Sequence, residues 1–210
     1  MKKIFFILLA SLCIATTNAQ VKSSINISPE ISGGVGIKAG ADLSIKLNNR
    51  LSLVPGIYWE LRNRVDNEHS SKGIDYHARD LNHYISVPIR LGITLFGVES
   101  SKVSGTLLVG PYIACGVGGT SRWRITDNGT ITTSSCDAFT EESQCPNRFD
   151  YGLNFGFNIL LKEHFVIGAY GEFGFKRIYQ FKSNWANFFG SLMPGMTNHI
   201  ALGLNFGYQF

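Results

Sequence analysis

The chain has 210 residues and a formal net charge of +4, with 23 glycines, 12% aromatic residues and 16% charged residues. This composition suits one sheet-rich domain with little helix, and the weak positive charge argues against a nucleic-acid partner. The sequence has no basic run, no glycine-rich phosphate loop and no repeat of solenoid length, which argues against nucleotide-binding and solenoid folds.

Residues 1–19 have the pattern of a secretory signal peptide. Two lysines precede an apolar stretch, and small residues lead to a cleavage site after Ala19. Lipidation at Cys13 is not favoured, because Leu12 is too large for the cleavage that precedes a lipid-carrying cysteine. The apolar stretch is shorter than the ~20 residues of a membrane-spanning helix, and no other stretch is a candidate. We expect residues 20–210 to form one domain, which can enter a membrane only as strands.

Eight segments of this domain alternate apolar residues with small or polar ones, which is the period of a β-strand with one apolar face. In chain order they cover approximately residues 23–31, 36–47, 51–62, 81–95, 103–118, 150–162, 165–177 and 200–210. The last segment shows the pattern clearly, because Leu202, Leu204 and Phe206 alternate with glycine and asparagine.

The polar faces of these segments distinguish a soluble barrel from a membrane barrel. The outer surface of a soluble barrel is rich in Lys and Glu, whereas these faces are rich in Gly, Ala, Ser and Asn. Small residues with a few charges fit the narrow lumen of an eight-stranded membrane barrel. We therefore predict an all-β fold, an eight-stranded antiparallel up-and-down transmembrane β-barrel with its apolar face toward lipid.

The linkers between the segments alternate between short and long. Outer-membrane barrels have short periplasmic turns, long extracellular loops and both termini in the periplasm. We expect periplasmic turns at 48–50, 97–102 and 163–164, and extracellular loops at 63–80, 120–148 and 181–197. Aromatic girdles are predicted on the extracellular side at Trp59, Tyr151, Phe175 and Tyr179, and on the periplasmic side at Phe96, Phe165, Tyr208 and Phe210.

Charged residues on the inner faces are the first candidate functional group. They are Glu30, Lys38, Asp42, Lys46, Glu60, Arg62, Arg90, Glu172 and Lys176. They could form a proton path or an ion filter, or they could be paired charges that fill and stiffen a narrow barrel. We favour the second interpretation, because eight strands leave hardly any room for a water channel and buried charges require partners. The predicted lumen charge network comprises Asp42, Glu60, Arg62, Arg90, Glu172 and Lys176, and no porin activity is expected.

The long loops contain three further features. Cys136 and Cys145 lie in one loop of a chain directed to an oxidising compartment, so we predict a disulfide between them, while Cys115 lies on the lipid face of a strand. His69 and His77 lie among acidic residues that could be drawn as a metal or hydrolase site, but their spacing matches no metal motif. A solvated loop is favoured there, and we predict no catalytic residue, metal or cofactor. The apolar run of residues 187–196 is expected to pack on the barrel rim or in the outer leaflet.

Four stretches, "YISVPIRLGITLF", "GPYIACGVGG", "DYGLNFGFNILL" and "LGLNFGYQF", resemble the small outer-membrane β-barrel family that includes the PorT proteins. The resemblance covers nearly all of the mature chain. It implies location in the outer membrane and a C-terminal aromatic residue, here Phe210, that the barrel assembly machinery reads as an assembly signal. Some PorT-like proteins are linked to protein secretion across the outer membrane and to surface motility.

Three functions remain as hypotheses. The leading one is an outer-membrane barrel with a structural or surface-binding role and no open pore, because binding residues concentrate on loops held by a rigid scaffold. The alternatives are a component of a PorT-like export or motility assembly and a lipid-modifying barrel enzyme, of which the enzyme is the less favoured. The expected partners are outer-membrane lipids, the assembly machinery during insertion and an envelope protein bound by the extracellular loops.

Overall fold

The computed structural model describes residues 21–69, 74–97, 102–127, 129–141, 143, 145–177 and 198–210. The predicted signal peptide and the predicted loop 181–197, with its apolar run, lie outside these residues. Among the described residues, no helix is long and apolar enough to cross a membrane.

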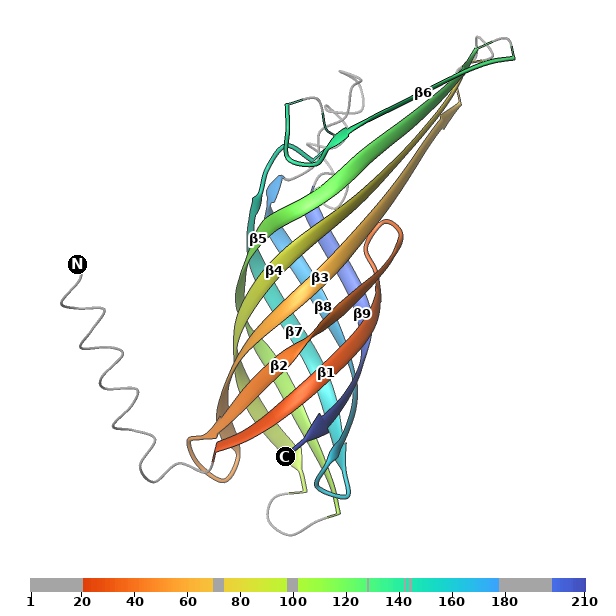
Figure 1. Cartoon of the computed structure of the whole chain (residues 1–210). Helices are drawn as coiled ribbons and strands as arrows, with labels where there is room; N and C mark the ends of the chain where they lie inside the picture. The colour runs from red at the N-terminus through yellow and green to blue at the C-terminus, as the bar shows by residue number, and fades with distance from the viewer. Residues whose placement is uncertain are drawn as a thin grey trace, which may run out of the picture.

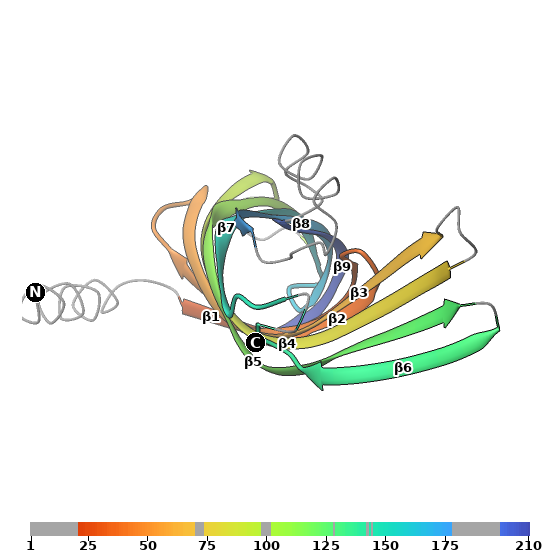
Figure 2. The same cartoon turned by 90° about the horizontal axis from the view of Figure 1, so that it is seen from above.

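The described chain is an antiparallel β-barrel (Figure 1). Its strands are β1 (Val21–Ile31), β2 (Val35–Lys46), β3 (Leu51–His69), β4 (Ile74–Phe96), β5 (Val103–Asp127), β6 (Thr130–Asp137), β7 (Phe149–Leu161), β8 (Phe165–Arg177) and β9 (Asn198–Gln209). The sheet order is β4-β3-β2-β1-β9-β8-β7-β5-β6, and the additional pairing of β4 with β5 closes a ring that leaves only β6 outside. Seen from above, this ring is closed (Figure 2). The predicted eight-stranded antiparallel barrel is confirmed.

The ring closes where the last strand meets the first. β9 pairs with β1 over the register from Ser24↔Gln209 to Ile31↔Leu202. The backbone N–H of Phe210 extends this pairing by donating a hydrogen bond of 2.8 Å to the carbonyl of Ser23. Neither edge strand of the barrel is therefore left with a row of unpaired backbone groups.

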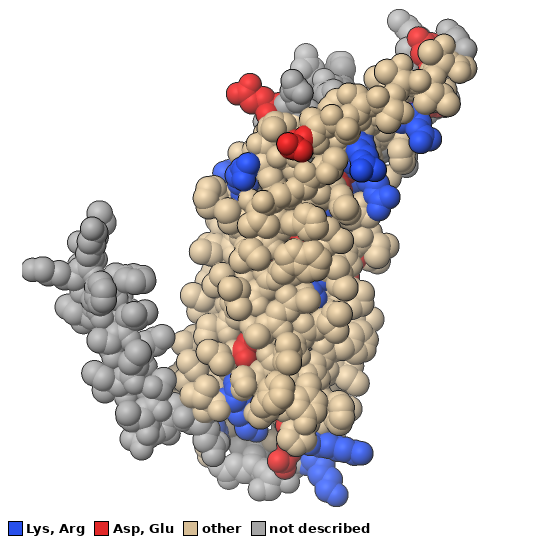
Figure 3. Space-filling view, in the orientation of Figure 1, with Lys and Arg blue, Asp and Glu red and all other residues tan. Residues whose placement is uncertain are grey.

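The outer surface of the barrel is apolar, and its inner surface is polar. On β9, for example, Leu202 is 63% exposed and Leu204 54% exposed, whereas Asn205 is buried. The space-filling view shows few atoms of Lys, Arg, Asp or Glu on the visible face of the barrel wall between its two ends (Figure 3). Such a surface lowers the free energy of the protein only when lipid covers it, because water contact with this apolar area is unfavourable.

Tight connections join the strands at one end of the barrel, which we call the short-turn end. In the turn between β2 and β3, the side-chain oxygen of Asn48 accepts hydrogen bonds from the backbone N–H groups of Arg50 and Leu51, at 2.9 and 2.8 Å. Aromatic rings gather on the outside at this end: Tyr208 makes edge contacts with Phe165 and Phe210. These rings occupy the level predicted for the periplasmic girdle. At the opposite level Trp59, Tyr151 and Phe175 are exposed, and the remaining predicted girdle residue, Tyr179, lies outside the described residues.

At the other end, four strands continue beyond the barrel. The pairing of β2 with β3 ends at Leu61, and that of β5 with β7 ends at Cys115, so the chain beyond these points is no longer part of the closed ring. We call the resulting four-stranded sheet the outer sheet; it contains 62–69, 74–83, 119–127 and 130–137. It projects sideways from the barrel in both views (Figures 1 and 2).

The outer sheet corrects two predicted loops. Residues 63–80 form the outer halves of β3 and β4, apart from the undescribed tip, and residues 120–148 contain the end of β5 and all of β6. The pairing of β3 with β4 continues from Leu51↔Ile93 to His69↔Asp75. Hydrophobic alternation identifies a strand only where one face is apolar, so strands whose buried residues are polar, such as Asp80 and Ser121, escape this signal.

Between β6 and β7, the chain folds back over the mouth of the barrel. Phe139 packs edge-on against Tyr84 with ring centroids 5.5 Å apart, and Cys145 is fully buried beside them. The backbone is anchored to β5 by a hydrogen bond of 2.7 Å from the N–H of Gly116 to the carbonyl of Arg148. We call the described part of residues 138–148 the cap segment. With Tyr84, Tyr112 and Ala114 it forms a small apolar cluster above the polar lumen.

Candidate functional site

The lumen holds large tyrosines because glycines face them. A Cβ at Gly40 would lie 2.6 Å from Cδ1 of Tyr58, and one at Gly203 would lie 2.4 Å from Cε1 of Tyr170. Only glycine permits these ring positions. Both rings flank the ammonium of Lys38, whose Nζ lies 4.8 Å from the ring centroid of Tyr58 and 5.3 Å from that of Tyr170.

Lys38 of β2 lies between two glutamates. Its Nζ is 2.7 Å from Oε1 of Glu60 on β3 and also contacts Oε1 of Glu172 on β8. Asn154 on β7 donates a further hydrogen bond of 2.8 Å to Oε1 of Glu172. The side chains of Lys38, Glu60 and Glu172 are all almost completely inaccessible to solvent, so this ammonium compensates two buried carboxylates.

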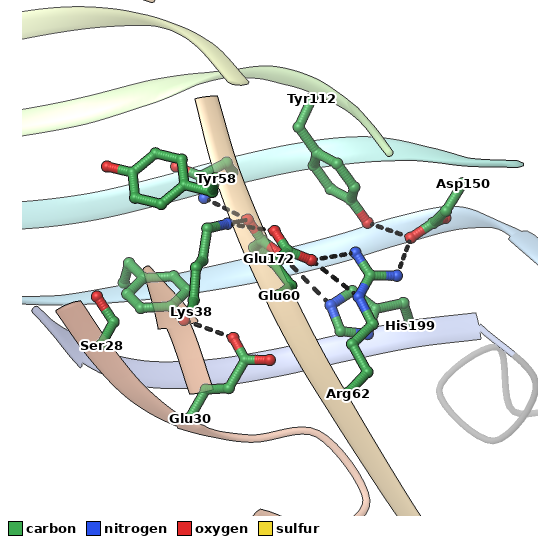
Figure 4. Close-up of polar contacts among 12 residues, drawn as sticks. Ser28, Glu30, Lys38, Tyr58, Glu60, Arg62, Tyr112, Asp150, Glu172 and His199 are labelled. Carbon is green, nitrogen blue, oxygen red and sulfur yellow. Dashed lines mark hydrogen bonds and ion pairs between the residues drawn. The ribbon is translucent and has the colours of Figure 1, made fainter. Parts of the chain in front are cut away.

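Arg62 extends this cluster toward β7 (Figure 4). Its guanidinium lies 2.7 Å from Oε2 of Glu60 and 2.9 Å from Oδ2 of Asp150. Tyr112 donates a hydrogen bond of 2.8 Å to the same oxygen of Asp150. The ring of Tyr84 lies 4.2 Å from Cζ of Arg62, in a cation–π contact. We call Lys38, Glu60, Arg62, Asp150, Glu172 and His199 the upper network.

The upper network crosses the lumen. In the ring, β1 and β9 separate the strands of Lys38 and Glu172, while β4 and β5 separate those of Arg62 and Asp150. The two ion pairs therefore link strands on different sides of the barrel. Because their side chains are packed and almost inaccessible, they occupy space that a water-filled pore would need.

A second cluster, the lower network, lies closer to the short-turn end. Arg90 on β4 forms an ion pair with Asp42 on β2. Tyr58 donates a hydrogen bond of 2.6 Å to Asp42, and the amide of Asn26 donates one of 3.1 Å to the same carboxylate. These four side chains come from β1 to β4, so the lower network joins neighbouring strands.

A cavity of about 580 Å³ begins at the lower network and includes turn residues of the short-turn end. Asp42 belongs to both its wall and the lower network, while Asn48 and Asn49 line it at the turn. The lumen therefore has a roomy half at the short-turn end and a half filled by ion pairs nearer the outer sheet.

Three members of the upper network have the donor types of a metal site. Donor atoms of Glu60, Glu172 and His199 lie within 4.8 Å of one another. However, each carboxylate oxygen already faces a positive or hydrogen-bonding group: Glu60 faces Lys38 and Arg62, and Glu172 faces Lys38 and His199, whose Nε2 is 3.4 Å away. A divalent cation would have to displace the ammonium of Lys38, so we interpret the three residues as part of an ion-pair network.

The structure places five of the six predicted network residues in these two clusters: Asp42 and Arg90 in the lower one, and Glu60, Arg62 and Glu172 in the upper one. Lys176 is half-buried and forms no ion pair with a described residue. Glu30, which the inner-face pattern also indicated, is buried and accepts a hydrogen bond of 2.5 Å from Tyr170.

Sequence reasoning missed Asp150 and His199. In each case the residue two positions later in the strand faces the lumen. Because side chains alternate with period two, this pattern could have identified both residues as lumen-facing. Asp150 stands at the start of its strand, and His199 stands one residue before the predicted last segment, 200–210, so neither was included. The metal site that was considered but not favoured included His69 and His77. His77 is an exposed residue of the outer sheet, and the side chains of residues 66–69, which include His69, lie outside the described structure.

The predicted disulfide is wrong for this structure, in which Cys136 and Cys145 are free thiols. The cap segment turns Cys145 into the barrel mouth, where its Sγ lies 3.3 Å from Oη of Tyr84. Cys136 stays on β6, half-buried, with Oγ1 of Thr140 at 3.8 Å. Spacing along the chain suggested a pair, but the two thiols pack against different parts of the protein.

Comparison with known proteins identifies the family. A family model described as an outer membrane protein β-barrel domain matches residues 10–180. The chain belongs to this family. Its fold and its apolar outer band agree with a position in the outer membrane. The match is to this general family and does not test the PorT type, which remains a prediction.

Solved structures of outer-membrane proteins are similar to the chain over most of its length. The attachment invasion locus protein Ail of Yersinia pestis has 14% identity and a TM-score of 0.36, covering 91% of this chain and 97% of that one. The N-terminal β-barrel domain of Pseudomonas aeruginosa OprF has 12% identity and a TM-score of 0.33, covering 92% and 100%. A major outer membrane protein of Thermus thermophilus has 12% identity and a TM-score of 0.47, covering 91% and 100%. Similarity at this level carries no argument about activity, and no curated protein matches the chain.

Proposed function

We propose that this protein is an outer-membrane barrel with a structural or surface-binding role and no open pore, and that its outer sheet is the part that meets a partner. One observation carries the proposal: the half of the lumen beneath the apolar cap is filled by paired charges, while a four-stranded sheet stands clear of the barrel. A transport pathway would need the opposite arrangement, a hydrated lumen with few obstructions.

The orientation of the barrel supports this role. Bacterial outer-membrane barrels have their short turns in the periplasm, so the outer sheet would be extracellular. β6 pairs on one side only, with β5, and all but one of its residues are exposed. An exposed sheet edge of this kind can accept a strand of a partner protein.

The proposal is tested by two measurements, one on the purified protein and one on intact cells. In planar lipid bilayers the reconstituted barrel should give no stepwise ion conductance, because the upper network and the cap close the lumen. On intact cells of a strain in which the native cysteines are replaced, a membrane-impermeant maleimide should label Thr133→Cys on β6 and spare Lys162→Cys in a short turn. Reproducible single-channel conductance, or labelling of the turn instead of β6, would reject the proposal.

The export and enzyme alternatives remain predictions without a supporting contact among the described residues. A component of an export assembly should be recovered with partner proteins when it is cross-linked in whole envelopes and purified. A lipid-modifying enzyme should change the mass of envelope lipid during incubation with the purified barrel.

A further inference from the structure

The outward face of the outer sheet carries three arginines at adjacent positions. The register places Arg79 of β4 directly opposite Arg122 of β5, and Arg124 lies two residues further along β5, opposite His77. All three arginine side chains are exposed. In Figure 3, the atoms of Lys and Arg gather where the outer sheet leaves the barrel. We call Arg79, Arg122 and Arg124 the arginine patch.

No described anion lies directly opposite the patch; the acidic residues that share its face, Asp75 and Asp137, are diagonal to Arg124 and Arg122. Arg79 donates a hydrogen bond of 3.3 Å to the neutral side chain of Asn63, and none of the three arginines forms an ion pair with a described residue. Like charges directly opposite each other on neighbouring strands are destabilising. An external anion held between Arg79 and Arg122 would remove this repulsion.

The patch lies just beyond the lipid-facing band. On the same outward face, Trp59 stacks on His83 with ring centroids 5.6 Å apart, at the level of the predicted aromatic girdle. Arg79 precedes His83 by four positions on β4, away from the short-turn end, which corresponds to roughly 13 Å along the strand at about 3.3 Å per residue. Because barrel strands are tilted by about 45°, this places Arg79 roughly 9 Å above the girdle, at the outer edge of the headgroup layer.

The tilt of the outer sheet turns this face toward the membrane. In Figure 1, β6 lies above β5, β4 and β3, and the view from above shows it further from the barrel axis than they are (Figure 2). The sheet therefore leans outward as it rises, so its outward face looks down on the leaflet that surrounds the barrel. Only that leaflet supplies a continuous layer of anionic groups at this depth.

We propose that the arginine patch binds phosphate groups of an outer-leaflet glycolipid. Guanidinium groups match phosphate oxygens in a bidentate geometry, and two of them opposite each other can hold one phosphate from both sides. The inference rests on the proposed orientation, with the outer sheet extracellular. It does not depend on whether the lumen conducts ions, so a conductance measurement and a lipid-binding measurement can fail separately.

The test uses the folded barrel in detergent and native mass spectrometry. The probes are a diphosphorylated lipid A and the same lipid without phosphate. The triple variant Arg79→Gln, Arg122→Gln, Arg124→Gln removes the patch. A matched control, Arg50→Gln, Lys102→Gln, Lys162→Gln, removes three exposed cations at the short-turn end. A heat-dependent shift on electrophoresis verifies that every variant is folded.

We expect the wild type and the control to retain the phosphorylated lipid, and the patch variant to bind it about tenfold more weakly, since three exposed charge contacts are lost. Retention should fall with added salt, because exposed charges are screened. Equal retention by the patch variant, or equal binding of the phosphate-free lipid, would overturn the proposal. So would binding of a soluble sulfated polysaccharide with the same arginine dependence when the lipid shows none.

Discussion

Replacing Lys38 with methionine tests whether the lumen is held together by paired charges. The variant keeps the length of the side chain but removes the cation from between Glu60 and Glu172. Both carboxylates are completely buried, so Glu60 would retain only Arg62 and Glu172 only Asn154 and His199. Leaving a buried charge without its partner costs about 3–5 kcal/mol, and we expect Lys38→Met to lower the free energy of unfolding by that amount.

The assay is urea unfolding of the barrel in lipid vesicles, followed by tryptophan fluorescence and by the electrophoretic shift of the folded form. Lys102→Met is the control, because Lys102 is exposed in a short turn, and its unfolding midpoint should not change. Adding Glu172→Gln to Lys38→Met should recover part of the loss, since the second buried charge is then removed with the first.

Two results would refute the reasoning. A loss of less than about 1 kcal/mol for Lys38→Met would mean that water reaches the carboxylates and that the lumen is not closed. A double variant less stable than Lys38→Met would mean that Glu172 stabilises the barrel through contacts other than its charge pairing.

Two further predictions concern the lumen and the cap. Gly203→Ala should lower the free energy of unfolding by about 1–3 kcal/mol, because its Cβ would overlap the ring of Tyr170, whereas Gly118→Ala, with no atom within 4 Å, should be neutral in the same assay. Burial raises the pKa of the Cys145 thiol to about 11 from an ordinary 9.0, so Cys145, followed by mass spectrometry of its own peptide, should react slowly with iodoacetamide at pH 8 in the folded barrel and quickly in urea. Because the folded state holds this proton more tightly, its contribution to stability should be lost as pH rises from about 9 through 11; fast alkylation of Cys145 in the folded protein at pH 8 would contradict the buried position.

Local sequence determined the barrel and the identity of most lumen charges. Residues such as Leu202 and Asn205 reveal which face of a strand meets lipid, because the side-chain period of a strand is two and lipid accepts only apolar side chains. The same alternation predicted that the side chains of Glu60, Arg62 and Glu172 face the narrow lumen, where charges require partners. The alternation of residues was sufficient here because one face of each strand meets lipid and the other meets the polar lumen.

The partners of these charges, the outer sheet and the state of the cysteines were decided by tertiary structure. Whether Lys38 reaches Glu172 depends on how the strands are staggered around the closed ring. This stagger cannot be read from the sequence. Beyond Leu61 the buried residues of β3, such as Arg62 and Asn63, are polar, so the apolar alternation that reveals strands disappears although the hydrogen bonds continue. Cys145 was predicted from its spacing to pair with Cys136, but the fold of the cap buries it against Tyr84, because contacts between residues 61 positions apart depend on how the chain packs.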